Sequence, residues 1–147
     1  MAVCREVMTP EPACCHTSDS IVRVAQLMKS ADVGAVPVIE SSSNPKLVGM
    51  VTDRDIVVKG VAAGRSVDDA TVKEVMTTDI VTCREDDDVS KAVAQMAERK
   101  VRRMPVVDGS GMLRGIIAQA DIATRVHQDK TTGALVEAIS APGALRR

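Results

Sequence analysis

Thr52 and Asp55 are the two residues of this sequence whose chemistry and spacing best suit a small polar ligand. They stand where a predicted strand, Lys46–Thr52, gives way to a predicted helix. An ionised carboxylate can accept two hydrogen bonds from the cis-diol of a ribose. A threonine hydroxyl and the free amides of a first helical turn can hold a phosphate. The same spacing also fits a simple helix cap, with Thr52 or Asp53 as the capping residue and Asp55 in solvent.

The chain carries its pattern twice, so this pair has a counterpart at Ala118 and Asp121. The copies are 68 residues apart before a predicted hairpin turn and 66 residues apart after it, so their lengths differ only in that turn. A repeat this complete predicts two similar units about a pseudo-twofold axis. The matched residues, first copy and then second, include Met8-Thr9 and Met76-Thr77, Met28 and Met96, Pro37-Val38 and Pro105-Val106, Gly49 and Gly115, and Asp55 and Asp121.

Hydrophobic periodicity predicts the order strand, helix, strand, strand, helix in each unit. In the first unit we expect strands at Ala13–His16, Ala35–Glu40 and Lys46–Thr52, and helices after the caps Ser18–Ser20 and over about 54–63. In the second we expect strands at Ile80–Thr82, Met104–Asp108 and Met112–Ala118, and helices at Val89–Arg99 and Gln119–Gln128. The repeats then occupy residues 1–63, with the lead Val3–Met8, and 71–128, with a linker at 64–70 and a tail at 129–147 that includes a short helical segment at Leu135–Ile139. A unit of about 60 residues buries too little surface alone, so the two sheets should pack on each other.

Composition narrows the classes of function. The 147 residues are 45% apolar, which is ordinary for a globular protein, yet they include no Phe, Tyr or Trp. Without aromatic rings to stack on bases, and with a net charge of −1, the chain is poorly suited to bind nucleic acid. No apolar run is long enough for a membrane span and no signal peptide is evident, so we expect a cytoplasmic protein. The four cysteines form no disulfide-framework pattern and are expected as free thiols.

Several motifs resemble those of CBS domains. Gly49–Asp55 resembles the family's Gly-x-x-Thr/Ser-x-x-Asp motif, and Gly34–Val38 and Val101–Val107 resemble its strand motif. The segments Val7–Pro10 and Val75–Thr77 match its lead sequence, so the resemblance covers about residues 5–126. It implies an α/β (α+β) fold: a Bateman module of two pseudo-symmetric CBS units, each a small mixed sheet packed with helices. Thr52–Gly60 also resembles stand-alone CBS-pair proteins.

The resemblance implies two clefts, each using the acidic residue of one repeat and a base-binding wall from the other. The ligands expected from the family contain adenosine: AMP, ATP, NAD or S-adenosylmethionine, none of them an obligatory cofactor. Arg102 or Arg103 would neutralise a phosphate, although a solvated surface charge is an equal alternative. The first cleft would be lined by Val51, Thr52, Asp55, Ile80, Val81, Val101, Arg102 and Arg103.

The twin cleft departs from the family pattern. Ala118 takes the place of Thr52 and Gly34 that of Arg102, so a hydroxyl and a charge are lost. We expect this cleft to be weaker, empty, or suited to a nucleoside with less phosphate contact, with Gln119 as a substitute polar partner. Its residues would be Ala13, Val33, Gly34, Ile117 and Asp121.

Cys14-Cys15-His16 could suggest a zinc site, since thiolate and imidazole are good zinc ligands. Adjacent cysteines on a strand point to opposite faces, however, so structural thiols and no metal site are the preferred interpretation. Cys15 and Cys83 are repeat equivalents, which favours packing roles for both. Charge at a helix N-terminus likewise explains the acidic run Glu85–Asp88 better than a cation site does.

The function expected is regulatory sensing of an adenine nucleotide, with the output passed to a downstream protein that the sequence does not identify. We expect a homodimer that does not bind a membrane. The alternative is a structural or protein-interaction CBS dimer that has lost ligand binding. Catalysis is disfavoured, because no nucleophile–base or metal-hydrolase arrangement is evident.

Overall fold

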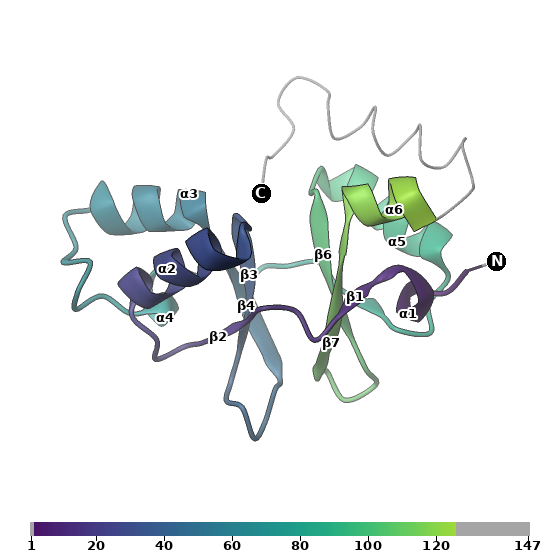
Figure 1. The fold of residues 1–147 in the computed structure, drawn as a ribbon, viewed down its shortest axis with the longest axis horizontal. Coiled ribbons are helices and arrows are strands. Elements are labelled where there is room, and N and C mark those ends of the chain that lie inside the picture. Colours follow the sequence, from purple (N-terminus) through teal and green to yellow (C-terminus); the bar gives the residue numbers. More distant parts are fainter. Residues whose placement is uncertain (1, 126–147) are drawn as a thin grey trace. The chain divides into compact units, whose positions relative to one another are not determined.

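The protein divides into two compact units in a computed structural model that describes residues 2–125 (Figure 1). Among the described residues, unit 2 contains Ala13–Ile80, whereas unit 1 combines residues 2–12 with residues 81–125. Both contain the small mixed sheets and helices that the sequence predicted. The last part of the helix expected at Gln119–Gln128, and the segment Leu135–Ile139, lie outside the described residues.

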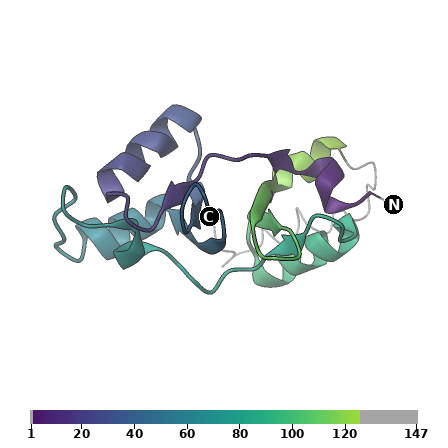
Figure 2. The ribbon, with the colours of Figure 1, turned by 90° about the horizontal axis from the view of Figure 1, so that it is seen from below.

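Unit 2 is built on a three-stranded sheet in the order β2-β3-β4. Strand β2 pairs with β3 in parallel, and β3 pairs with β4 in antiparallel to form the predicted hairpin. Figures 1 and 2 show α2 and the helix that follows β4 side by side on one face of this sheet. The elements are β2 (Cys15–His16), α2 (Ile21–Ala31), β3 (Ala35–Ile39), β4 (Leu47–Thr52), α3 (Asp53–Asp55), the π-helix η1 (Ile56–Val61) and α4 (Val72–Val75).

Unit 1 repeats this plan with a four-stranded sheet in the order β1-β7-β6-β5. Strand β5 is parallel to β6, which forms an antiparallel hairpin with β7. The elements are α1 (Cys4–Val7), β1 (Thr9–Pro10), β5 (Cys83–Arg84), α5 (Val89–Arg99), β6 (Arg103–Val107), β7 (Leu113–Ala118) and α6 (Gln119–Arg125).

The lead segment of each sequence repeat packs in the unit built from the other repeat. Strand β1 pairs with β7, so Thr9 lies opposite Ile116, and Figure 1 shows the purple N-terminal segment beside the green β7. In the same way Thr77 bridges to Met50 in unit 2, through N–O distances of 2.9 and 2.8 Å. Each sequence repeat is therefore continuous along the chain. Each compact unit, however, combines the body of one repeat with the lead segment of the other.

The two long helices begin where the sequence predicts. Ser20 caps α2 by accepting a hydrogen bond from the Arg23 amide, and Asp88 caps α5 by accepting one from Ser90. Each helix ends in a left-handed residue, Asp32 or Lys100, which stops the helical hydrogen-bond pattern. The observed bounds of α5 are those predicted from periodicity.

Two local predictions were wrong. Ile80–Thr82 is not a strand; the strand lies at Cys83–Arg84, because only there does the chain reach the parallel pairing with Val106 and Val107. The helix expected over about 54–63 is largely a π-helix, η1, entered through a single turn at Asp53–Asp55. Periodicity does not distinguish a π-helix from an α-helix over so short a segment.

Each unit has its own aliphatic core. In unit 2, Ile21 and Val24 of α2 pack with Val36, Val38 and Val51 of the sheet. In unit 1, Met96 of α5 packs with Met104, Ile117 and Ile122. Valine, isoleucine and methionine thus fill the space that aromatic residues would otherwise occupy, as the composition requires.

Gly49→Ala should destabilise unit 2 by about 1–3 kcal/mol, because overpacked contacts force backbone shifts. A Cβ at this position would lie 2.8 Å from the carbonyl oxygen of Thr77, where the lead segment crosses β4. Urea denaturation would measure the loss. Gly109→Ala is the matched control, since a Cβ there meets nothing within 4 Å. Equal stability of the two variants would contradict a tight crossing at Gly49.

Candidate functional site

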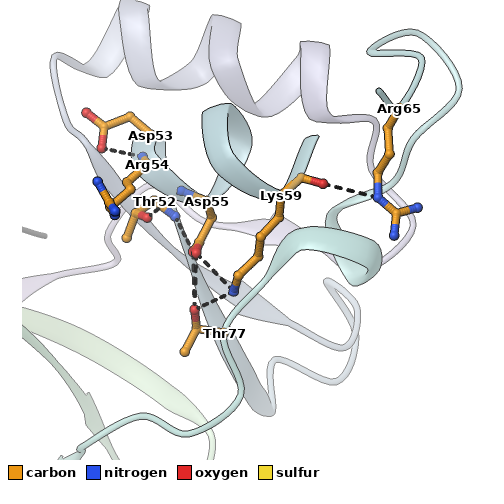
Figure 3. Close-up of polar contacts among 7 residues, drawn as sticks. All are labelled: Thr52, Asp53, Arg54, Asp55, Lys59, Arg65 and Thr77. Carbon is orange, nitrogen blue, oxygen red and sulfur yellow. Dashed lines mark hydrogen bonds and ion pairs between the residues drawn. The ribbon is translucent and has the colours of Figure 1, made fainter. Parts of the chain in front are cut away.

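Thr52 and Asp55 form a reciprocal hydrogen-bonded pair at the junction of β4 and α3 (Figure 3). The Asp55 amide donates to Thr52 Oγ1, and the Thr52 amide donates to Asp55 Oδ2, each at 3.0 Å. This is a capping box with aspartate in place of the usual glutamate or glutamine. Thr52, not Asp53, is therefore the capping residue, and both members of the pair are buried.

The carboxylate of Asp55 has two further partners. Lys59, one helical turn later in η1, forms an ion pair with this carboxylate, with its Nζ 3.1 Å from Oδ1. Thr77 Oγ1 lies 3.3 Å from both carboxylate oxygens and also accepts a hydrogen bond from Lys59 at 3.3 Å. Figure 3 shows the three side chains converging on one point. The simple cap interpretation placed Asp55 in solvent. In the structure, Asp55 lies instead in a buried polar cluster with Lys59 and Thr77.

Three elements position this cluster. Strand β4 ends at Thr52, and the following turns bring Asp55 and Lys59 to the same side. Thr77 arrives from the lead segment of the second repeat, fixed by its backbone pairing with Met50. The Lys59 side chain is 45% exposed and the Asp55 side chain 10% exposed, so the lysine can leave without unfolding its surroundings, whereas the carboxylate cannot.

Sequence reasoning missed Lys59 and Thr77. A signal for Lys59 was present in its i+4 spacing from Asp55. Thr77 belongs to the repeated Met-Thr motif, but its contact depends on the exchange of lead segments, which no local pattern encodes.

The predicted residues of each cleft divide between the two units. Thr52 and Asp55 are in contact in unit 2, and their cooperation with residues of unit 1 stays a prediction. Val51 and Ile117 are fully buried in the cores of their own units, so in this structure neither residue exposes surface to a ligand. Unit 2 holds Val51, Thr52, Asp55, Ile80, Ala13, Val33 and Gly34, whereas unit 1 holds Val81, Val101, Arg102, Arg103, Ile117 and Asp121.

Arg102 is half-buried, and its Nε has no hydrogen-bond partner among residues 2–125. Its carbonyl accepts a hydrogen bond from the Gln119 amide at 2.9 Å, which ties the residue to the start of α6. The buried Nε is therefore a donor left unsatisfied within the described residues.

At the equivalent junction of unit 1, Asp121 keeps one of the two hydrogen bonds that join Thr52 and Asp55. Its Oδ2 accepts a hydrogen bond from the Ala118 amide at 2.9 Å, the counterpart of the bond from Thr52 to Asp55. Ala118 has no hydroxyl to return the second bond, so this junction offers a ligand one polar group fewer than its twin.

The thiols of unit 2 have a structural environment. Burial is the main reason that the pKa of Cys15 rises to about 12, and the Cys15 thiol lies 3.8 Å from the Pro37 carbonyl oxygen. Burial also raises the pKa of Cys14. Both Cys15 and its equivalent Cys83 are buried in the cores, which confirms the packing expected of them. Within the described residues, no three His, Cys, Asp or Glu side chains are grouped to hold a metal ion.

Comparison with known families matches CBS domains to residues 4–60 and 72–128. The chain belongs to the CBS-domain family. This CBS pair is 33% identical over 145 residues to hypoxic response protein 1 of Mycobacterium tuberculosis, covering 99% of both chains. It is 32% identical over 118 residues to the uncharacterized protein MK0525 of Methanopyrus kandleri, of which it spans 57%. The resemblance to stand-alone CBS pairs, the mycobacterial protein among them, is thereby confirmed.

Solved structures agree with this CBS pair in fold. Hypoxic Response Protein I, solved with two coordinated zinc ions, aligns with a TM-score of 0.76 and 34% identity over 83% of this chain and 97% of its own. CBSX2 in complex with AMP aligns with a TM-score of 0.75 and 26% identity over 88% and 99%. The CBS pair of MJ0100, bound to 5-methylthioadenosine and S-adenosylmethionine, aligns with a TM-score of 0.71 and 25% identity over 84% and 94%. CBS pairs of this fold thus bind adenosine-containing ligands.

Asp55→Ala should lower the free energy of unfolding by about 1–3 kcal/mol, because the buried Thr52 amide and Thr77 hydroxyl lose their acceptor. Chemical denaturation without ligand would measure this. Asp53→Ala is the control, since Asp53 is exposed and accepts a bond from the adjacent Arg54 amide at 2.8 Å. If both variants lose the same stability, the polar cluster contributes nothing beyond a surface carboxylate.

Proposed function

We propose that this CBS pair is a regulatory module, not an enzyme, that binds an adenine nucleotide in the cleft containing Thr52 and Asp55. The observation that carries the proposal is the buried Thr52–Asp55 pair with the displaceable Lys59. Support comes from CBS pairs of the same fold solved with AMP, 5-methylthioadenosine and S-adenosylmethionine. Binding would change the dimer geometry or the affinity for a downstream protein.

In this proposal Asp55 accepts the ribose diol and Lys59 changes partner. Thr77 has one hydroxyl proton to share between two carboxylate oxygens, so the carboxylate retains acceptor capacity. A ribose hydroxyl takes the place of the Lys59 ammonium at Oδ1, and the released ammonium pairs with a phosphate. Ile80, Val81 and Val101 form the apolar wall for the base, and Arg102 or Arg103 provides a second cation.

The cleft containing Asp121 binds more weakly in this proposal. Ala118 contributes no hydroxyl and Gly34 no charge, so a nucleoside without phosphate is its best ligand. The unequal clefts would allow one chain to respond to two ligands that differ in charge.

The second candidate function is a structural homodimer without ligand. One observation favours it: both oxygens of Asp55 already have protein partners. Val57, Val58 and Val61 on η1 are also exposed, which suits contact with a second copy. A homodimer is compatible with both candidates, so only ligand binding distinguishes them.

Calorimetry with AMP, ATP, NAD and S-adenosylmethionine separates the two candidates. We expect at least one to bind, and Asp55→Ala to weaken binding about ten-fold or more through the loss of charged hydrogen bonds. Asp121→Ala is the matched control in the other half of the repeat. If no ligand gives heat or a thermal shift, the structural candidate replaces the sensor. Weakening by Asp121→Ala alone would move the site to the twin cleft.

Lys59→Met tests the exchange of partners. The variant keeps the aliphatic stem but cannot pair with a phosphate, so affinity for AMP should fall several-fold relative to affinity for adenosine. Competition at Asp55 is also removed, so adenosine should bind as well as before or better. The readout is the ratio of the two dissociation constants. Lys73→Met, on the exposed side of α4, should leave the ratio unchanged. A constant ratio in Lys59→Met would show that Lys59 serves only the protein.

A further inference from the structure

Cys4 and Cys83 form a buried thiol pair in unit 1 that the proposed nucleotide site does not use. Cys4 lies in α1 and Cys83 in β5, and they are 0% and 3% exposed in the same core cluster. Each thiol is the main influence on the pKa of the other, so the two side chains are near neighbours. Both thiols are free in this structure.

The backbone keeps the two cysteines together. The amides of Cys4 and Arg5 donate to the carbonyls of Asp87 and Glu85, just after β5, at 2.9 and 2.8 Å. Val3 bridges to Asp88, and the Val89 amide donates to Ala2 at 3.0 Å. The lead segment is therefore attached to the β5–α5 connection on both sides of Cys4. These backbone bonds hold Cys4 close to the end of β5, where Cys83 lies.

The pair breaks the symmetry of the duplication. Cys83 has its repeat equivalent in Cys15, but Cys4 corresponds to Val72. In unit 2, Val72 and Cys15 take the core positions that Cys4 and Cys83 take in unit 1. The Cys15 thiol lies near the Pro37 carbonyl instead of a second thiol. Packing alone is satisfied by valine here, so the second thiol of unit 1 adds chemistry that the fold does not require.

We propose that Cys4 and Cys83 are a redox-active pair, converted by a small-molecule disulfide into an intrachain disulfide that locks the lead segment onto unit 1. The Cys4 thiolate attacks one sulfur of the oxidant, forming a mixed disulfide and releasing one thiolate. The Cys83 thiolate then attacks the Cys4 sulfur and releases the second. The protein pair loses two protons and two electrons, and the oxidant becomes two thiols.

The order of attack follows from the different surroundings of the two thiols. Cys83 lowers the pKa of Cys4, so Cys4 is the thiol that ionises more readily, whereas Cys4 and burial raise the pKa of Cys83. Because both sulfurs are buried, reaction requires α1, only four residues long, to separate locally from the loop after β5. The rate of oxidation therefore reports the opening of the lead segment.

The test uses the full chain, oxidised glutathione under native conditions, and non-reducing tryptic mapping. We expect peptide Met1–Arg5 joined to Glu74–Arg84, an intact mass lower by two hydrogen atoms, and reversal by dithiothreitol. The disulfide closes a long loop, so the oxidised protein should melt about 10 °C higher than the reduced protein. Cys14 and Cys15 share the peptide Glu6–Arg23 and serve as internal controls.

Two variants complete the test. Cys14→Ala/Cys15→Ala should form the linkage unchanged, whereas Cys83→Ala should stop at a glutathione adduct on Cys4 and show no rise in melting temperature. The proposal is overturned if the folded wild type gives no joined peptide, if Glu6–Arg23 carries the main linkage, or if joining occurs only in denaturant. The wild-type map decides the matter even if Cys83→Ala does not fold.

Discussion

The exchange of lead segments is the constraint on which both units depend. Each sheet is completed by a few residues that precede the other repeat in sequence, and the crossing is close enough that only glycine fits at Gly49 and Gly115. The backbone bonds between Met50 and Thr77 place a threonine hydroxyl beside Asp55. The same element that closes the sheet of unit 2 therefore also completes its polar cluster.

This arrangement offsets the cost of burying the charged Asp55 carboxylate. A carboxylate with a 10% exposed side chain needs partners, and an amide, a hydroxyl and an ammonium supply them. The partners differ in how firmly they are held, because the amide belongs to the helix cap whereas Lys59 reaches in from solvent. Lys59 is therefore the partner that the proposed ligand would replace, whereas the helix cap would stay intact.

Differences between the copies carry the functional information. The cores differ little, since valine, isoleucine and methionine recur at matched positions. The junctions differ in one hydroxyl, Thr52 against Ala118, and the cores in one thiol, Cys4 against Val72. A duplicated fold provides an internal control for each, because the equivalent position shows what packing alone accepts.

The sequence by itself determined the repeat, the CBS family, the bounds of α5 and the position of Thr52 and Asp55 at a strand–helix junction, because periodicity, caps and motifs are local properties. It misplaced β5 and gave no indication of the π-helix, since pairing partners and the number of residues per turn are set by packing. Only the tertiary structure decided that Asp55 is buried, that Lys59 and Thr77 are its partners, and that Cys4 meets Cys83. Thr77 and Cys4 both lie in lead segments that fold into the unit of the other repeat, so contacts between distant parts of the chain create these environments.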